Sequence, residues 1–332
     1  MKYAVVGLGA VGSIIARHLM ETKENVILLG KNDHVDSVKK QGLIIDEKQY
    51  GNDTLKITND YAMVSDVDVV FVCVKSQDTE PVAHLMQKHL KKNTLIISLQ
   101  NGVHNAQILR DITKVKAISG VVLFNAVSSS SGVASLTMKG GLVLEFSNDF
   151  ASVLSQIKQH FKSQGLDVRF VFDIEPVLWS KLIVNTQIAV TALTGQTIKE
   201  SMKNRDSRII IIATLREALF IVKQVKIPLR SLPGVDPKRI IRVLRFLGSF
   251  SAVLSKVVLG MKDDARNSMW QSLSQGKTTE IDYINGEIVR LADQKYLKAP
   301  VNTKLVELVK KTETRIFEKP FQPHDLRKIL KL

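Results

Sequence analysis

A glycine-rich hexapeptide near the start of the chain, Gly7-Leu8-Gly9-Ala10-Val11-Gly12, constrains the fold more than any other feature. It lies between a β-branched run and a helical pattern, Val11–Met20, and so predicts a strand, a tight turn and a helix in that order. The first glycine permits the turn, the second lets backbone amides approach a pyrophosphate, and the third lets helix and strand pack closely. Because the amino end of the helix favours an anion, we predict that Gly7, Leu8, Gly9, Ala10, Val11 and Gly12 bind a dinucleotide.

The rest of the first half alternates β-branched runs with helical patterns, which is typical of doubly wound α/β domains. The expected strands are Tyr3–Gly7, Val26–Leu29, Val67–Val74, Thr94–Ser98, Ala117–Val121 and Gly141–Phe146, and the serine run Ser128–Ser131 is expected to be a loop. After Val171 helical patterns take over: Pro176–Leu193, Asp206–Val225, Pro237–Leu259, Thr279–Gln294 and Val301–Phe317. We predict an α/β fold with a Rossmann doubly wound parallel sheet over residues 1–172 and an all-α domain for catalysis and dimerisation over residues 173–332.

The residues after the second expected strand bear on the choice between NAD and NADP. An acidic side chain at this point binds the free ribose 2′-hydroxyl of NAD, whereas a cation suits the 2′-phosphate of NADP. Here the strand continues into Gly30-Lys31-Asn32, so Lys31 favours NADPH. In the alternative, Lys31 is a solvated surface lysine and Asp33 provides the acidic group.

Polar side chains also follow two later strands. Lys75 comes directly after the strand Val67–Val74, and Asn101 follows Thr94–Ser98. Because the carboxyl ends of parallel strands line the ligand crevice, we expect both residues near the cofactor. Asn101 can donate and accept, which suits a ribose, an amide or a carboxylate. Lys75 could instead be a surface lysine.

A lysine inside an apolar helix opens the second half of the chain. Lys181 and Asn185 are four residues apart and share a helix face, while the following residues are largely apolar. Such a lysine either extends its amine to solvent, pairs with an acid, or has a function. Burial would lower the pKa of Lys181 and make it a proton donor near neutral pH.

Composition excludes several classes of protein. The chain has 332 residues, one cysteine and a formal net charge of +15. Cys73 lies in an expected buried strand, where we predict core packing, and a single cysteine forms no internal disulfide. The cations are spread along the chain without interleaved aromatics, which argues against nucleic acid. The longest apolar candidate, Ile209–Val222, is interrupted by charges, so we expect no membrane span and a cytoplasmic protein. Histidine spacing indicates no metal site.

Five motifs together resemble the ketopantoate reductase family, 2-dehydropantoate 2-reductases, over most of the chain. They are Gly7–Gly12, Val74-Lys75, Gln100-Asn101-Gly102, Trp179-x-Lys181-Leu182-x-x-Asn185, and a block comprising Ser268-Met269-Trp270-Gln271 with Thr279-Glu280-Ile281-Asp282-Tyr283-Ile284-Asn285-Gly286. The length also agrees, apart from an apparent insertion between Asn204 and Ala265. The resemblance implies an oxidoreductase that reduces ketopantoate to pantoate with NADPH, on the route to pantothenate and coenzyme A.

The resemblance also implies roles for individual residues. Lys181 would be the general acid that protonates the ketone oxygen, and Asn101, Asn185 and Ser268 would hold the substrate. Glu280 would contact the nicotinamide ribose or pair with Lys181 and orient it. Those implied to line the cofactor site, besides the glycine-rich turn, are Lys31, Lys75, Asn101, Ala126 and Glu280. From the residues alone, Glu280 and Asp282 lie on a helix pattern, where Glu280 could also be an exposed charge.

The chain departs from the family pattern after Asn185. The family carries a second asparagine four residues on, where this chain has Ala189, and the segment is one residue short. The loss of a substrate hydrogen bond leaves two alternatives open: a reductase of another branched 2-keto acid, or a sensor that binds NADPH without turnover. A two-domain 3-hydroxy acid dehydrogenase is a further reading, which the block around Glu280 disfavours. Apolar stretches at Ile209–Ile212 and Ile240–Leu259 favour a homodimer.

Overall fold

A computed structural model describes residues 1–22, 24–51, 56–232, 235–246, 266–314 and 319–332. The chain divides into two compact units, Met1–Ile174 and Glu175–Leu332, each with its own internal packing. Among the residues described, the strands that belong to sheets lie in the first unit, and the second is built from helices. The predicted fold class, a Rossmann sheet followed by an all-α part, is therefore confirmed.

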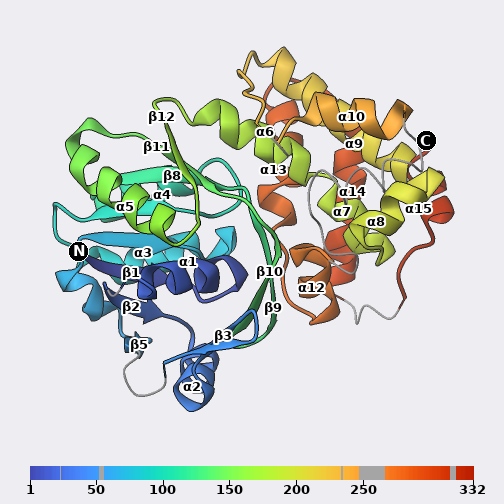
Figure 1. Cartoon of the computed structure of the whole chain (residues 1–332). Helices are drawn as coiled ribbons and strands as arrows, with labels where there is room; N and C mark the ends of the chain where they lie inside the picture. Colours follow the sequence, from blue (N-terminus) through green and yellow to red (C-terminus); the bar gives the residue numbers. More distant parts are fainter. Residues whose placement is uncertain (23, 52–55, 233–234, 247–265, 315–318) are drawn as a thin grey trace. The chain divides into compact units, whose positions relative to one another are not determined.

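The main sheet of the first unit has eight strands in the order β12-β11-β8-β7-β6-β1-β2-β5 (Figure 1). Six of them are parallel in the Rossmann order: β5 (Lys56–Thr58), β2 (Asn25–Leu29), β1 (Lys2–Val6), β6 (Val69–Val72), β7 (Leu95–Ser98) and β8 (Ala117–Val122). The two exceptions are β11 (Leu142–Glu145), which runs antiparallel to β8, and β12 (Val168–Val171), which is parallel to β11. The sheet is thus parallel over the part that carries the glycine-rich turn.

Both faces of this sheet are buried, which explains why its strands are continuously apolar. On one face, Tyr3 and Val5 of β1 pack in a core with α1 (Ala10–Met20) and α5 (Ala151–Ser163). On the other, Ala4 and Val6 pack with α3 (Thr79–Gln87) and α4 (Asn105–Thr113). Successive residues of β1 face opposite sides of the sheet because side chains alternate along a strand with a period of two residues. Cys73 packs against the first core, as predicted, and burial raises the pKa of its thiol.

A second, smaller sheet has the order β4-β3-β10-β9. Its strands are β3 (Leu43–Ile45), β4 (Lys48–Tyr50), β9 (Asn125–Ser130) and β10 (Val133–Met138), and α2 (Asn32–Gln41) leads into it. The loop expected at Ser128–Ser131 holds only for Ser131, which lies in the turn after β9; Ser128 and Ser130 instead pair with Ala134 and Val133 in an antiparallel ladder. A run of serines has no strand propensity of its own, so the pairing with β10 decides its conformation.

The second unit is arranged around α9 (Arg205–Gln224), which packs against most of its other helices. These are α6 (Glu175–Asn185), α7 (Ile188–Thr194), α8 (Ile198–Lys203), α10 (Pro237–Phe246), α13 (Asn285–Asp293), α14 (Pro300–Glu313) and α15 (Pro323–Ile329), while α12 (Ser268–Ser274) packs on α7. Two predicted helices extend beyond the described residues, so Pro237–Leu259 is seen only to Phe246 and Val301–Phe317 only to Thr314.

Two helices predicted as continuous are broken. The segment Pro176–Leu193 is interrupted at Thr186 and Gln187, where the Thr186 hydroxyl donates to the Ile183 carbonyl at 2.7 Å and competes with the helical ladder. The segment Thr279–Gln294 begins with a short 3₁₀ turn, Ile281–Tyr283, and α13 starts only at Asn285 because Ile284 has non-helical dihedrals. Glu280 therefore precedes that turn and does not lie on a helix, contrary to the prediction.

The expectation that no segment has the length and apolarity of a membrane span needs one correction. Within the described ranges, Glu175–Thr194 alone passes that test by length and composition, and 83% of it is buried inside the folded chain. This segment is α6 with α7, which includes Lys181 and the break at Thr186. Burial of this extent is what a central helix of a packed unit shows, so the segment is weak evidence for a membrane span.

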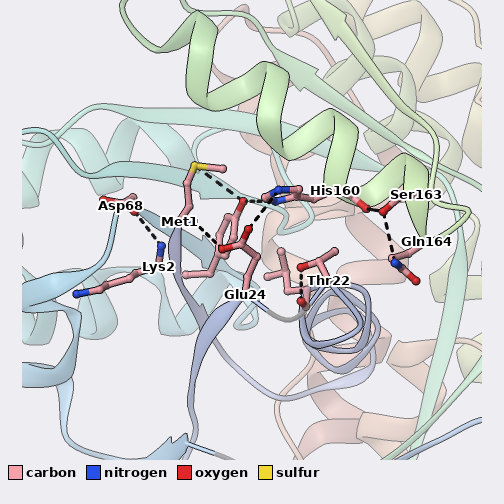
Figure 2. Close-up of polar contacts among 10 residues, drawn as sticks. Met1, Lys2, Thr22, Glu24, Asp68, His160, Ser163 and Gln164 are labelled. Carbon is pink, nitrogen blue, oxygen red and sulfur yellow. Dashed lines mark hydrogen bonds and ion pairs between the residues drawn. The ribbon is translucent and has the colours of Figure 1, made fainter.

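Polar contacts join the amino ends of the central strands, on the edge away from the glycine-rich turn (Figure 2). The Tyr3 hydroxyl lies 2.9 Å from His160 Nδ1 on α5, and His160 Nε2 lies 3.3 Å from Glu24 before β2. The Lys2 amide donates to Asp68 before β6 at 2.8 Å. Burial, followed by the charge of Glu24, raises the pKa of Tyr3, so its hydroxyl stays protonated. The network ties β1, β2, β6 and α5 together.

His18 should make the first unit acid-sensitive. It is 4% exposed, and burial followed by the charge of Arg17 lowers its pKa from 6.5 to about 4. The unfolded chain therefore binds a proton at pH 6.5 that the folded chain refuses until about pH 4, so stability falls as pH drops through this window. We expect urea unfolding to show a loss of about 2 kcal/mol at pH 5 relative to pH 7.5 from this residue.

Two variants test the origin of this acid sensitivity. The H18Q variant should lose that part of the pH slope, whereas H84Q, which alters an exposed histidine on α3, should keep it. An unchanged slope in H18Q would assign the acid sensitivity to other groups.

Candidate active site

The glycine-rich turn leaves no room for a side chain at two of its positions. Gly7 has a φ of +94°, and a Cβ there would lie 2.7 Å from the Val74 backbone nitrogen. A Cβ on Gly12 would lie 1.9 Å from the Gly7 carbonyl oxygen. These contacts show that β1, α1 and the end of β6 approach too closely for any side chain.

Gly9 differs from the other two glycines. No atom lies within 4 Å of a Cβ built on Gly9, which caps the amino end of α1 without a side-chain hydrogen bond. The first turn of α1 contains no acidic residue. The space beside Gly9 at the positive end of the helix is therefore open, which fits the approach of a dinucleotide's pyrophosphate to the first backbone amides of α1.

Lys31 stands where the sequence predicted it, just beyond β2, and caps the amino end of α2. Its side chain is 77% exposed, and its Nζ lies 3.3 Å from Asp78 Oδ2, in the segment after β6. Asn59 donates to the Asn32 side chain at 2.6 Å and so fixes the residue that follows Lys31. Asp33 lies in the first turn of α2 and is exposed.

A buried polar network, which the sequence analysis missed, holds the loops that carry Lys75 and Asn101. The Ser76 hydroxyl donates to the Asn101 carbonyl at 2.7 Å, and Asn105 donates to the same hydroxyl at 3.2 Å. Thr79 donates to Asn105 at 2.8 Å and accepts from Gln100 at 2.7 Å. The network joins the ends of β6 and β7, so Lys75 and Asn101 lie at neighbouring strand ends as predicted. The members of this network are polar residues close in sequence to Lys75 and Asn101. That closeness was the only signal in the sequence that could have revealed them.

Ala126 lies on β9, and the small sheet is anchored to α1. Arg17 Nη1 of α1 lies 2.9 Å from Asp46 Oδ2 in the turn between β3 and β4, and Tyr50 donates to Glu21 at 2.8 Å. Asp46 Oδ1 accepts the Leu136 amide of β10 at 2.8 Å. These contacts position Ala126, which packs against the core that includes α1.

In the second unit, Lys181 and Asn185 lie on the same face of α6. The residue before the lysine is held by two hydrogen bonds: the Ser180 hydroxyl donates to the Pro176 carbonyl at 2.8 Å and accepts the Arg230 amide at 3.1 Å. Burial lowers the pKa of Lys181 to about 8. An ammonium with this pKa is a far better proton donor near neutral pH than an ordinary lysine.

Glu280 and Ser268 come from separate segments of the second unit. Ser268 is exposed at the first position of α12, whose amino end is capped by Asn267 accepting the Trp270 amide at 2.8 Å. Glu280 is half-buried and follows Thr279, whose hydroxyl donates to Glu313 of α14 at 2.6 Å. That contact ties the residue before Glu280 to α14. Its pairing with Lys181 or with a ribose stays a prediction.

Asn285 links the Glu280 block to the lysine helix. Its side chain is fully buried and donates at 3.0 Å both to the Thr186 carbonyl, one residue after Asn185, and to Asn302 on α14. The Thr186 carbonyl can accept this bond because the helix breaks there. The motif that contains Asn285 was noted in the sequence, but its structural role was not.

Ala189, the residue that departs from the family pattern, is fully buried in α7. An asparagine amide at this position would need a hydrogen-bond partner inside the packed unit or in a bound ligand. The alanine removes that requirement, and with it one polar group.

Within the described ranges, no cluster of three or more His, Cys, Asp or Glu side chains could bind a metal ion.

A dinucleotide turn on a Rossmann sheet, together with a helical unit that carries a desolvated lysine, defines a class of two-domain dehydrogenases and reductases. The comparisons with known proteins narrow this class. The model of the ketopantoate reductase PanE/ApbA family matches residues 3–148, and the model of the family's C-terminal part matches residues 173–313. The chain belongs to the ketopantoate reductase family, as its motifs predicted, and is an oxidoreductase of the 2-dehydropantoate 2-reductase type with a nicotinamide cofactor.

Individual relatives agree over nearly the full length. The 2-dehydropantoate 2-reductase of Pyrococcus horikoshii is 29% identical over 95% of this chain and 98% of its own. The crystal structure of a PanE/ApbA family ketopantoate reductase from Ralstonia eutropha has a TM-score of 0.80 at 27% identity, covering 95% of this chain and 99% of that one. The ternary structure of D-mandelate dehydrogenase with NADH and anilino(oxo)acetate shares the fold, with a TM-score of 0.79 at 24% identity, covering 95% and 99% of the two chains.

Proposed function

We propose that this protein reduces 2-dehydropantoate to pantoate with NADPH. The observation that carries the proposal is Lys181, a desolvated lysine with a pKa of about 8 in the motif position of the family's proton donor. The cofactor supplies the hydride when it is bound. Lys181 protonates the ketone oxygen, and the cation also stabilises the negative charge that develops there.

The remaining roles follow from the chain's own groups. Asn185, one helical turn from Lys181, and Ser268 bind the substrate with Asn101, because amide and hydroxyl donors suit a carboxylate and a hydroxyl. Glu280 orients Lys181 or holds the nicotinamide ribose. The glycine-rich turn with Lys75, Asn101 and Ala126 binds the cofactor, and the charge of Lys31 favours its 2′-phosphate over the free hydroxyl of NADH.

The substrate could be another branched 2-keto acid, and buried Ala189 is the observation that favours this second candidate. A pocket with one polar group fewer tolerates a substrate that lacks the matching hydroxyl, since a buried unpaired donor on either partner is costly. An NADPH-binding sensor without turnover is the remaining alternative.

We also propose that the protein forms a homodimer. Within the first apolar stretch, Ile209–Ile212, Ile210 and Ile211 are buried within the unit, so these two leave no surplus apolar surface. The second stretch extends beyond the described residues after Phe246. Phe220 on α9 and Phe246 on α10 are 51% and 75% exposed, and large exposed aromatics of this kind suit a subunit interface.

Nicotinamide absorbance provides the direct test of the reaction. Purified protein is given NADPH or NADH with ketopantoate, and then with a panel of branched and unbranched 2-keto acids. We expect turnover of ketopantoate, with NADPH preferred to NADH. Faster turnover of another keto acid would move the assignment to the second candidate. Tight NADPH binding without oxidation across the whole panel would favour the sensor.

A further inference from the structure

A carboxylate lies beside the cation that is proposed to select the cofactor. Asp78 Oδ2 is 3.3 Å from Lys31 Nζ, and the Asp78 side chain is 32% exposed. Asp78 occupies the N-cap position of α3, where aspartate commonly accepts a backbone amide, yet its side chain makes no capping hydrogen bond. Its carboxylate is instead directed to Lys31 on another element.

The ion pair spans the strand that carries the glycine-rich turn. Lys31 follows β2 and Asp78 follows β6, and these two strands flank β1 in the sheet. All three strands are parallel, so their carboxyl ends lie at one edge. The pair therefore joins the two strand ends on either side of the dinucleotide turn, close to the end of β2, where the ribose 2′ position of a dinucleotide is read.

The charges of this pair oppose each other with respect to a 2′-phosphate. Lys31 attracts the phosphate dianion, whereas Asp78 both repels it and occupies the ammonium that would bind it. A free 2′-hydroxyl carries no charge, so it is not repelled by Asp78, and a carboxylate at this point can accept a hydrogen bond from it. The loss of the Lys31 contact and the repulsion thus fall on NADPH and not on NADH.

We propose that Asp78 is a specificity-determining residue that weakens the preference for NADPH over NADH. It acts through Lys31 and through its own charge at the 2′ position. The proposal rests on the proposed use of a nicotinamide dinucleotide with Lys31 near its 2′ group. It goes further by assigning a carboxylate that limits the selectivity which the lysine provides.

The test uses the full-length protein with the D78N variant, which keeps the shape of the side chain and removes its charge. Binding of 2′,5′-ADP and of 5′-AMP is measured by titration calorimetry, without keto acid, so the result is independent of the substrate assignment. The kcat/KM values for NADPH and NADH are measured beside it. The matched control is E80Q, which removes an exposed carboxylate two residues away on the same helix.

The D78N variant should bind 2′,5′-ADP about three- to tenfold more tightly, as expected for removing one partly exposed charge near a dianion. Binding of 5′-AMP should not become tighter, and the gain for 2′,5′-ADP should shrink in 0.5 M salt because screening weakens exposed charges. The change should appear in KM for NADPH and not in kcat. E80Q should show a much smaller effect.

Two results would overturn the proposal. If D78N left the ratio of the two affinities unchanged, Asp78 would be a surface charge without influence on the cofactor. If D78N weakened 2′,5′-ADP binding, Asp78 would hold Lys31 in the binding position and so support NADPH. A wild-type preference for NADH would contradict the proposed cofactor, but the direction of the D78N shift would still decide this question.

Discussion

The Lys181→Ala variant should lower kcat for keto acid reduction by about 10²- to 10⁴-fold, the usual contribution of a positioned general acid. Cofactor binding should persist, because the glycine-rich turn and Lys31 belong to the other unit. Stopped-flow NADPH oxidation at saturating substrate measures the effect, and NADPH fluorescence confirms binding. The Lys181→Arg variant should stay inactive despite its charge, since a guanidinium does not release a proton near neutral pH.

The pKa of Lys181 also predicts how the rate of reduction depends on pH. Burial lowers the pKa of Lys181 to about 8, and the reaction needs the protonated form. The rate of reduction should therefore be high below pH 8 and fall as pH rises through about 8. Lys223→Ala, an exposed lysine on α9, should keep both rate and profile. Full activity in Lys181→Ala would remove the lysine from the mechanism.

Replacing Lys181 by an apolar residue should raise the stability of the protein although it lowers the activity. The folded chain holds at neutral pH an ammonium that burial disfavours, since the folded pKa lies below the unfolded value of 10.5. The Lys181→Met variant removes this cost. We expect its free energy of unfolding at pH 7 to rise by about 1 to 3 kcal/mol, with the gain disappearing as pH approaches 10.5. Lower activity with higher stability is the signature of a residue kept for function.

The Gly12→Ala variant should abolish cofactor binding. Its Cβ would lie 1.9 Å from the Gly7 carbonyl oxygen and 3.2 Å from Cys73 Cβ, and a backbone atom cannot yield without moving the turn. Displacing the amides that face the pyrophosphate by about 1 Å is expected to weaken NADPH binding about 10²-fold or more. The strain should also lower the free energy of unfolding by about 1 to 3 kcal/mol.

Gly9→Ala is the matched variant for this prediction. The new methyl group meets no protein atom within 4 Å, and the φ of Gly9, −74°, is accessible to alanine. We expect normal thermal stability with weakened NADPH binding, because the methyl group enters the space that a pyrophosphate would approach. Unchanged binding in both variants, measured by NADPH fluorescence titration, would place the cofactor elsewhere.

The sequence predicted the parts of the fold that local patterns encode. The strands of the Rossmann sheet are short, β-branched and buried on both faces, and the glycine-rich turn has a backbone that few other residues permit. The family resemblance was equally secure, since it rests on several motifs in a fixed order. Lys31, Lys75 and Asn101 follow the carboxyl ends of their strands, and Lys181 and Asn185 share a face of α6, as expected, whereas Glu280 lies outside the predicted helix.

What the sequence could not predict depends on tertiary partners. Ser128–Ser130 form a strand because β10 pairs with them. The helix breaks after Asn185, where the Thr186 hydroxyl donates to the Ile183 carbonyl and the Asn285 side chain donates to the Thr186 carbonyl. The network of Ser76, Thr79, Gln100 and Asn105 consists of ordinary polar residues whose roles appear only when two loops meet. Glu280 lies outside a helix, and the residue before it, Thr279, binds Glu313, which is 34 residues further along the chain.

The polar network at the amino ends of β1, β2 and β6 affects how the first unit can evolve. Tyr3, Glu24 and His160 hold the strands together at one edge, whereas the glycine-rich turn, Lys31 and Asn101 lie at the other. A strand of five residues separates the two edges, so a substitution at one leaves the contacts of the other intact. Thermal tolerance and cofactor choice are thereby free to evolve separately, and an engineer can alter the 2′ selectivity without first rebuilding the anchor of the sheet.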